Sequence, residues 1–584
     1  MKTLIKYTDL LKENKRLKDE LAGKPAFNLH ILNNITVNML KDVLEYNVRL
    51  MGINPDIEVH DYDTIVQDSM AMGDDNKAKV IFWELANYMP GLYYKADEMD
   101  NAQLQQLIDK VKNDIDLVYG SLKNSSIVFV NTFCASPFAE HDVRKSNLRI
   151  AEEVLNQYLD QQKPDNVFLV DVKRVYERYS LEACIDMRMF NGSKSLHTLT
   201  FFQGYVEEIL PVLRSVTGKA KKALIFDCDN TLWGGILGED GFDGIQMGED
   251  GKGKSFHLVQ RMAVELSKKG IIIGLNSKNN AADVDEVLEK HPDMYLRDEH
   301  IVIKKVNWQD KVSNLRQIAT DLNIGIDSLV FIDDSNFEVN FIREQLPEVS
   351  TFQVPKSAHE YPAMMKEVSR LFYHHSQTKE DLERIKMYKQ EQQRESQKDS
   401  FGNLDEYLSS LGIVIKIYKN DSSLIPRTAQ MTQKTNQFNL TTQRYTENDI
   451  KQFIESPDYG VYVFEVSDKF GSYGITGLSI AKTNGNEAEF DSFLMSCRVL
   501  GRKIESSFLS YIIEDLKSNG IEKVASKYSK TAKNAQVEPF YDNNGFEVLQ
   551  QNENEKQYRL QLDNWQAIYP EFITIELAES GVNA

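Results

Sequence analysis

The chain has 584 residues, of which 41% are hydrophobic and 27% are charged, and its formal net charge is −20. A single core cannot organise a chain of this length, so we expect two to four globular domains. No apolar run reaches the ~20 residues that span a bilayer, and the polar helical pattern over residues 1–21 lacks the apolar core of a signal peptide. The acidic balance disfavours nucleic acids and anionic membranes as partners, because both select clustered Lys and Arg. We therefore expect a cytoplasmic protein that binds small metabolites or other proteins.

The pattern of apolar runs divides the chain into three α/β parts. Short apolar runs alternate with helical stretches over residues 1–215, and a second cycle of strands and helices runs over 216–375. Such alternation is typical of mostly parallel sheets covered on both faces. Residues 376–402 are charged and poor in large apolar residues, which predicts a solvated helical linker. Residues 403–565 show a mixed strand and helix pattern, and we expect 566–584 to be a peripheral tail.

Two carboxylates directly follow an apolar strand in LIFDCDNTLWGG, namely Asp227 and Asp229. If the segment stays extended, both side chains point the same way, ~7 Å apart at the backbone. A hard cation such as Mg²⁺ prefers carboxylate oxygens, and one carboxylate could attack phosphorus while the other moves a proton. An isolated DxD of this kind would also be explained by an exposed turn after a strand.

Three further segments extend this pattern. Ser277 in IIIGLNSKNN offers a hydroxyl to a phosphate oxygen, and Lys311 in NWQDKVSNL offers a cation to a transferring phosphoryl group. Asp333 and Asp334 in LVFIDDS complete an acidic metal site. Because open α/β sheets collect ligand-binding side chains beyond the carboxyl ends of their strands, the four segments together predict a phosphoryl-transfer site.

These segments resemble the four motifs of the haloacid dehalogenase (HAD) superfamily of phosphatases. The resemblance implies a Rossmannoid domain, Mg²⁺ as cofactor, and a mechanism in which an aspartyl phosphate forms and is hydrolysed. Thr231 and Lys278, beside the motif residues, are expected to contact the substrate. The implied roles are Asp227 as nucleophile and metal ligand, Asp229 as general acid/base and metal ligand, Asp334 as the remaining metal ligand, Asp333 as a ligand through water or a partner of a ligand, and Ser277 and Lys311 as phosphate anchors.

Longer strings are more specific than the superfamily motifs. DNTLWGGILGEDGFDGI, VFIDDSNFEVNFIRE and MTQKTNQFNLTTQRYT resemble the FkbH-like family (HAD subclass IIIC), and SCRVLGR extends the resemblance over nearly the whole chain. This family is associated with making glyceryl-acyl carrier protein from 1,3-bisphosphoglycerate, by a phosphatase step and acyl transfer through a cysteine thioester. The resemblance implies an acyl carrier protein as partner. It also implies that Asn436 contacts the substrate, whereas a surface loop would be the alternative explanation of the polar residues around it.

The cysteines form no CxxC pair, which argues against a zinc or disulfide framework. Cys134 and Cys184 are expected to be small buried residues. Cys228 lies between carboxylates that would raise the pKa of its thiol, whereas Cys497 is followed by cations that would favour a thiolate. Cys497 is therefore the preferred acyl carrier, with Cys228, or no acyl-cysteine at all, as alternatives.

Residues 403–565 resemble the GNAT acyltransferase fold, through FDSFLMSC, RVLGRKIESSFLSYII and FYDNNGF. In GNAT enzymes an R/Q-x-x-G-x-G/A turn binds the CoA pyrophosphate through backbone N–H groups at a helix start. Here Arg498, Gly501 and Arg502 match the turn, but Lys503 replaces the last small residue. The phosphopantetheine of a carrier protein would use the same groove, and a degenerate domain used only for binding is the alternative.

Residues 1–215 resemble the flavodoxin-like SGNH-hydrolase fold. After the first strand, LNNITVN has no serine where an SGNH hydrolase would carry its nucleophile, and His197 has no evident triad partners. A scaffold or binding domain is therefore expected.

The preferred overall interpretation is a glyceryl transferase/phosphatase. The first alternative is a plain HAD phosphomonoesterase that acts on a sugar or nucleotide phosphate in a polysaccharide or secondary-metabolite pathway. The second is a non-catalytic assembly protein, which the complete acidic set disfavours.

Overall fold

The computed structural model of the chain describes residues 4–72, 77–138, 146–374, 387, 390, 394, 403–531 and 533–578, without the side chains at positions 404, 405 and 497. The chain forms two compact units. The first contains Met1–Leu213 with Thr446–Asp449, and the second contains Arg214–Tyr445 and Ile450–Ala584. The described residues form three sheets, two of them wholly parallel, which confirms the predicted multidomain α/β class.

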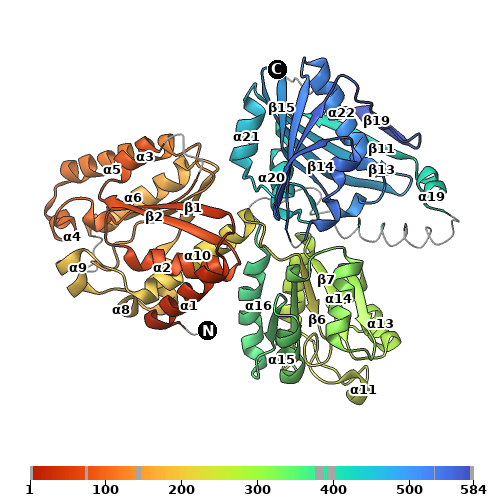
Figure 1. The fold of residues 1–584 in the computed structure, drawn as a ribbon. Helices are drawn as coiled ribbons and strands as arrows, with labels where there is room; N and C mark the ends of the chain where they lie inside the picture. The colour runs from red at the N-terminus through yellow and green to blue at the C-terminus, as the bar shows by residue number, and fades with distance from the viewer. Residues whose placement is uncertain are drawn as a thin grey trace. The chain divides into compact units, whose positions relative to one another are not determined.

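The first unit is built on a five-stranded parallel sheet of order β2-β1-β3-β4-β5. Its strands are β1 (Ala26–Asn33), β2 (Asn54–Tyr62), β3 (Ala78–Phe82), β4 (Val128–Asn131) and β5 (Val167–Val170). The central strands β3 and β4 are buried along their whole length, because helices cover both faces of the sheet. Figure 1 shows α3 and α5 on one face and α1 and α2 on the other.

Several helices of this unit begin at a capping side chain; Asp100 and Gln103, for example, form a capping box at the start of α5. They are α1 (Tyr7–Glu20), α2 (Asn38–Leu50), α3 (Ile65–Ala71), α4 (Leu92–Lys95), α5 (Asn101–Ser121), α6 (Asn147–Gln162), α7 (Val172–Tyr179), α8 (Leu181–Cys184), α9 (Met187–Ser193) and α10 (Leu199–Val216).

The strand order 2-1-3-4-5 is that of the flavodoxin-like fold, as predicted. Two hydrogen bonds join the loop after β1 to the loop after β3. The Asn34 side chain donates to the Glu84 carbonyl oxygen at 2.9 Å and accepts from the Glu84 N–H at 2.7 Å. His197 lies in the core, where its Nε2 is 2.9 Å from the Tyr176 hydroxyl and its ring stacks on Phe201.

The second unit contains a parallel sheet of order β10-β9-β6-β7-β8. Its strands are β6 (Ala223–Phe226), β7 (Ile272–Ser277), β8 (Ile301–Val306), β9 (Leu329–Asp333) and β10 (Ser350–Gln353). The helices associated with it are α11 (Leu237–Asp240), α12 (Lys254–Lys268), α13 (Ala281–Lys290), α14 (Lys311–Asp321), α15 (Asn336–Gln345) and α16 (Tyr361–Ser369). Because β6 lies between β7 and β9, the carboxyl ends of these three strands meet at one edge.

A mixed nine-stranded sheet completes the second unit, in the order β17-β18-β16-β15-β14-β13-β11-β19 with β12 beside β15. Its strands are β11 (Ile413–Lys419), β12 (Phe438–Asn439), β13 (Tyr459–Asp468), β14 (Gly471–Asn484), β15 (Glu487–Met495), β16 (Lys523–Ser529), β17 (Glu547–Gln551), β18 (Glu555–Gln561) and β19 (Ile573–Leu577). The helices of this region are α19 (Leu404–Leu411), α20 (Ile425–Lys434), α21 (Glu447–Glu455), α22 (Ile504–Ser518) and α23 (Phe540–Asn543).

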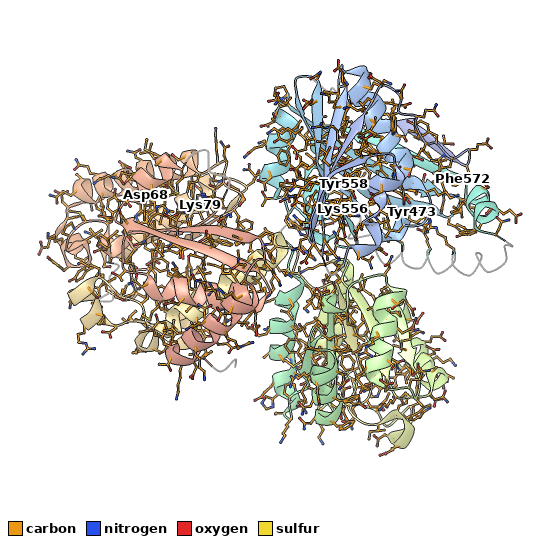
Figure 2. All side chains as sticks on the ribbon, viewed as in Figure 1. Asp68, Lys79, Tyr473, Lys556, Tyr558 and Phe572 are labelled. Atoms are coloured by element: carbon orange, nitrogen blue, oxygen red, sulfur yellow. The ribbon has the colours of Figure 1, made fainter. Side chains whose placement is uncertain are left out.

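Two segments differ from their predicted character. Residues 566–584 are not only a tail, because β19 pairs in parallel with β11, where its Ile573 and Ile575 pack on the core. The predicted linker 376–402 lies outside the described residues except at Met387, Gln390 and Arg394. Arg394 is buried rather than solvated, and its Nε is 2.9 Å from Asp468 Oδ2. Figure 2 labels Tyr473, whose ring lies 4.0 Å from the Arg394 guanidinium carbon.

Within the described residues, every helix is too short or too polar to cross a membrane.

Acid should destabilise the first unit through His197. Burial lowers the pKa of His197 to about 3, below the value of about 6.5 in an unfolded chain. The unfolded state therefore binds the extra proton, and His197 contributes stability above about pH 6.5 that is lost as the pH falls towards about 3. Between about pH 7 and pH 5 we expect the free energy of unfolding to fall by about 2 kcal/mol more in wild type than in His197→Gln. Urea unfolding followed by the fluorescence of buried Trp83 measures this difference. An equal loss in both proteins would contradict the assignment, and exposed His359→Gln is the control.

Candidate active site

Three carboxylates gather where β6 and β9 end. Oxygen atoms of Asp227, Asp333 and Asp334 all lie within 4.8 Å of one another. The sheet fixes this proximity, because β6 pairs with β9 and the Asp227 N–H donates to the Ile332 carbonyl oxygen at 2.9 Å. Carboxylate oxygens at this spacing suit a hard divalent cation.

Lys311 supplies the cation of this cluster. Its Nζ lies 3.0 Å from Asp227 Oδ1 and 2.6 Å from Asp333 Oδ2, and all three side chains are buried. Burial lowers the pKa of Lys311, but the charges of Asp227 and Asp333 outweigh it and hold the pKa above its usual range. Lys311 begins α14, whose first turn is capped by Asp310. Lys311 is therefore fixed in position and charged.

The cluster carries more negative charge than Lys311 balances. Burial raises the pKa of Asp227 to about 7, Lys311 opposes that rise, Asp333 adds to it, and a hydrogen bond from Ser277 opposes it. Burial and the neighbouring Asp333 likewise raise the pKa of Asp334. Both shifts show that Lys311 alone does not balance the charge of these carboxylates, and the residues present fit a divalent cation.

Both oxygens of the Asp333 carboxylate already accept hydrogen bonds. Its Oδ2 accepts from Lys311, and its Oδ1 accepts from the Ser335 N–H at 2.8 Å. Asp227 and Asp334 have more capacity left for a metal ion.

The Asp229 carboxylate lies outside this cluster, so its predicted place as a side-chain metal ligand needs correction. Its Oδ1 accepts from Trp233 Nε1 and from the Leu237 N–H, both at 3.0 Å, and its Oδ2 accepts from Asn279 Nδ2 at 2.9 Å. The expectation rested on an extended segment, but β6 ends at Phe226 and a turn follows. Alternation of side chains therefore stops before Asp229.

The other predicted contacts lie close to the cluster or just outside it. Ser277 ends β7, is buried, and lies 3.3 Å from Asn279 Nδ2. Thr231 is buried, and its hydroxyl has no hydrogen-bond partner in the described part of the chain. Lys278 is partly exposed, with its Nζ 2.6 Å from Glu338 Oε1, so a substrate would compete with Glu338 for it.

An amide network that the sequence analysis missed holds this arrangement. Asn276 Nδ2 donates to the Lys311 carbonyl oxygen at 3.0 Å, and Asn314 Nδ2 donates to Asn276 Oδ1 at 3.1 Å. Asn279 likewise fixes Asp229, because its Nδ2 donates to the Asp229 carboxylate. The run of Asn residues in LNSKNN was the available signal, since buried amides need partners.

The cysteines differ in their surroundings. Cys228 is fully buried, and burial followed by the charge of Asp227 raises the pKa of its thiol. Burial also raises the pKa of Cys134 and Cys184 to about 11. Cys497 begins the short helix η8 (Cys497–Val499), and its side chain is outside the described part.

The segment around Cys497 meets the polar motif that contains Asn436. β12 pairs antiparallel with β15, with Phe438 opposite Met495, so Asn436 and Cys497 leave the ladder at the same end. Ser496 and Arg498, the two neighbours of Cys497, line one pocket together with Asn436. Arg427 and Lys434 line it as well.

The predicted pantetheine turn has an irregular backbone. Gly501 has φ +77° and Lys503 has φ +59°, directly before α22. A positive φ suits glycine at position 501 and is a strained choice for a lysine. Arg502 is buried and donates to the Arg498 carbonyl oxygen, so its guanidinium serves to close the turn.

No model of a protein family and no curated protein matches the chain. Among solved structures, the N-terminal part of the protein BF1531 from Bacteroides fragilis contains a phosphatase domain and was crystallised in complex with Mg. It is 25% identical, with a TM-score of 0.54 over 63% of this chain and 99% of that one. A ribosomal-protein alanine N-acetyltransferase from Escherichia coli is 12% identical over 27% of this chain and 97% of that one, and Ard1 from Thermoplasma volcanium is 14% identical over 25% and 97%. Both have TM-scores of 0.21, too low to support an argument about this chain.

Asp334→Asn should reverse its effect on stability when Mg²⁺ is added. Without Mg²⁺ the substitution removes a repelling charge and should raise the melting temperature. With Mg²⁺ at about 100 times its dissociation constant, wild type should gain about 2.7 kcal/mol and Asp334→Asn much less. Thermal unfolding with and without Mg²⁺ tests this, with exposed Asp283→Asn as the matched control. An equal gain in all three proteins would place the metal elsewhere.

Proposed function

We propose that this chain is a Mg²⁺-dependent HAD-type phosphatase that uses Asp227 as nucleophile on a small phosphorylated metabolite. The observation that carries the proposal is the contact of buried Lys311 with Asp227 and Asp333, beside Asp334, at the carboxyl edge of a parallel sheet. The likeness to the Mg-complexed phosphatase-domain structure supports it.

The residues present fit the cation. Asp227 and Asp334 would hold Mg²⁺, and Asp333 would orient Lys311 beside it. When bound, Mg²⁺ supplies positive charge that offsets the charge of the carboxylates and of the substrate phosphate.

The chemistry then runs through two displacements. An oxygen of Asp227 attacks phosphorus, the bond from phosphorus to the leaving oxygen breaks, and the leaving oxygen takes a proton from Asp229. Water, deprotonated by Asp229, then attacks phosphorus and releases phosphate and the Asp227 carboxylate. Asn279, Trp233 and the Leu237 N–H hold the Asp229 carboxylate throughout.

Two groups would bind the transferring phosphoryl group. Lys311 presents a charged Nζ beside Asp227, and the Ser277 hydroxyl lies on the neighbouring strand end. Charge that develops on the phosphoryl oxygens would meet these donors without reorganisation, because both side chains are buried and fixed.

The preferred elaboration is a glyceryl transferase/phosphatase. The Cys497 thiolate would attack the acyl carbon of 1,3-bisphosphoglycerate and displace the acyl-bound phosphate, and the Asp227 site would hydrolyse the remaining phosphate ester. The thiol of the phosphopantetheine of an acyl carrier protein would then take the glyceryl group and release Cys497. Support comes from the FkbH-like strings and from Asn436, Ser496 and Arg498, which line one pocket beside Cys497. Without acyl transfer, the chain would be a plain phosphomonoesterase.

Asp227→Asn should abolish phosphate release from a simple phosphomonoester. The amide is a poor nucleophile, so we expect kcat to fall by at least about 10³-fold. Phosphate release in Mg²⁺, with and without chelator, measures the effect, and Asp283→Asn should behave as wild type. If Asp227→Asn kept wild-type turnover, this site would have no part in the reaction.

Cys497→Ala should stop carrier loading while phosphate release from a simple phosphomonoester continues. The reason is that the thiol, and not the aspartate cluster, would carry the acyl group. Intact mass of the carrier protein after incubation with 1,3-bisphosphoglycerate reads out loading, and Cys184→Ala is the matched cysteine control. Unchanged loading in Cys497→Ala would eliminate this residue, and phosphate release without any loading would favour the plain phosphomonoesterase.

A further inference from the structure

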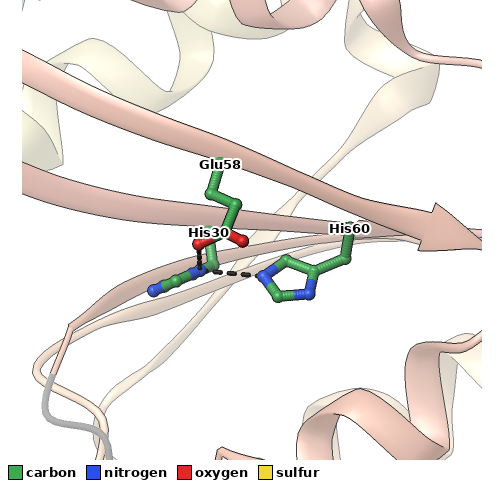
Figure 3. A group of neighbouring side chains, drawn as sticks. All are labelled: His30, Glu58 and His60. Atoms are coloured by element: carbon green, nitrogen blue, oxygen red, sulfur yellow. Dashed lines mark hydrogen bonds and ion pairs between the residues drawn. The ribbon is translucent and has the colours of Figure 1, made fainter.

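A second cluster of potential metal ligands lies in the first unit, apart from the phosphoryl chemistry. His30, Glu58 and His60 offer ligand atoms within 4.8 Å of one another. His30 Nδ1 is 2.8 Å from His60 Nε2 and 3.4 Å from Glu58 Oε2. Figure 3 shows the three side chains pointing toward one another from two adjacent strands.

The sheet builds this cluster in two steps. First, β1 and β2 pair in parallel with His30 directly beside Glu58, so these side chains share one face. Second, the register shifts between Ile31 and Asn33, because β2 carries one extra residue there. His60 lies at this bulge. Bulges re-aim side chains, which accounts for an imidazole reaching across to His30.

A carboxylate lies behind the His60 ring. His60 Nδ1 lies 3.7 Å from Asp68 Oδ2, beyond hydrogen-bond distance, while its Nε2 faces His30. Asp68 is itself held by a hydrogen bond from the Thr64 hydroxyl. A carboxylate behind the distal nitrogen of a histidine is the usual second partner of a metal-binding imidazole.

Two lysines lie near the cluster: Lys79 is paired with His30 on the other neighbour strand, and Lys41 lines a pocket together with Glu58. Lys79 Nζ donates to the Lys77 carbonyl oxygen at 2.9 Å, at the start of β3. In the register of the sheet, Lys79 is level with His30 and Glu58, and His60 lies two residues farther along β2. Figure 2 labels Lys79 and Asp68 in the first unit.

We propose that His30, Glu58 and His60 form a binding site for a divalent transition metal, with Zn²⁺ as the best match. Two imidazole nitrogens and one carboxylate oxygen make a three-ligand set that leaves one position of a tetrahedral ion open. The two nitrogens now share a proton across 2.8 Å. Binding would move that proton to the other nitrogen of its imidazole and separate the two ligating nitrogens to about 3.3 Å, the spacing set by two Zn–N bonds of about 2.05 Å.

The chemistry of the ligands separates this site from the carboxylate cluster. Oxygen-only ligands select Mg²⁺, whereas imidazole nitrogen selects zinc and its neighbours in the transition series. The ion would have access from solvent, because the Glu58 side chain is 66% exposed while His30 is 8% exposed. The inference is independent of the proposed phosphatase activity.

The test is calorimetric titration of the full chain with ZnCl₂, after chelator treatment and in excess MgCl₂ to occupy the carboxylate cluster. Wild type and the exposed-histidine control His359→Ala should each bind one Zn²⁺ more than His60→Ala. Asp68→Asn should keep the site but weaken it about 10-fold, because it loses only the carboxylate behind the His60 ring. Co²⁺ in place of Zn²⁺ should give visible absorption bands that His60→Ala lacks.

Circular dichroism shows whether each variant folds. If His60→Ala does not fold, Glu58→Ala decides, since its exposed side chain contributes little to packing, and it should also lose the Zn²⁺. The proposal is overturned if wild type takes up no Zn²⁺ in excess Mg²⁺, or if Glu58→Ala and His60→Ala bind as much as wild type. The two histidines would then be only a hydrogen-bonded pair.

Discussion

Lys311 lies between two buried carboxylates, 3.0 Å from Asp227 and 2.6 Å from Asp333. The parallel sheet of the second unit positions the residues that make this contact. Ionised groups leave water only when they are paired, and removal of one partner of a buried pair costs about 3–5 kcal/mol. Adjacent β6 and β9 supply the acids, while α14, held through Asn276, supplies the base. The arrangement still carries excess negative charge, so a divalent cation is needed before a phosphate can approach.

The two sheets of the second unit present residues of different charge and would therefore suit different reactions. The parallel sheet offers an acidic, preorganised edge suited to Mg²⁺ and phosphorus. The mixed sheet instead brings Asn436 to the end of β15, where Arg498 and Ser496 flank Cys497. Arg498, Arg427 and Lys434 line this pocket and would suit an anionic acyl donor. Phosphate release and acyl transfer would therefore use separate residues, and variants of one site should leave the other intact.

Sequence reasoning reached the acids and Ser277 because they follow apolar strands, which parallel pairing brings to one edge, whereas Lys311 was reached through the motif at the start of α14. It failed at Asp229, since alternation was carried past Phe226 into a turn in which Asn230 has φ +50°. The last strand was missed because β19 is short and half-exposed, so the apolar pattern of ITIEL is weak. His30 and His60 gave no motif at all; only the pairing of β1 with β2 and the bulge bring them together.

The central claim is that Asp227 becomes phosphorylated, and chemical trapping tests it most directly. Borohydride reduction of the enzyme during turnover converts an aspartyl phosphate to homoserine, and peptide mass spectrometry locates the change. The account predicts homoserine at position 227 that depends on both Mg²⁺ and substrate. Phosphate release with homoserine at another aspartate, or with no modified aspartate at all, would contradict it.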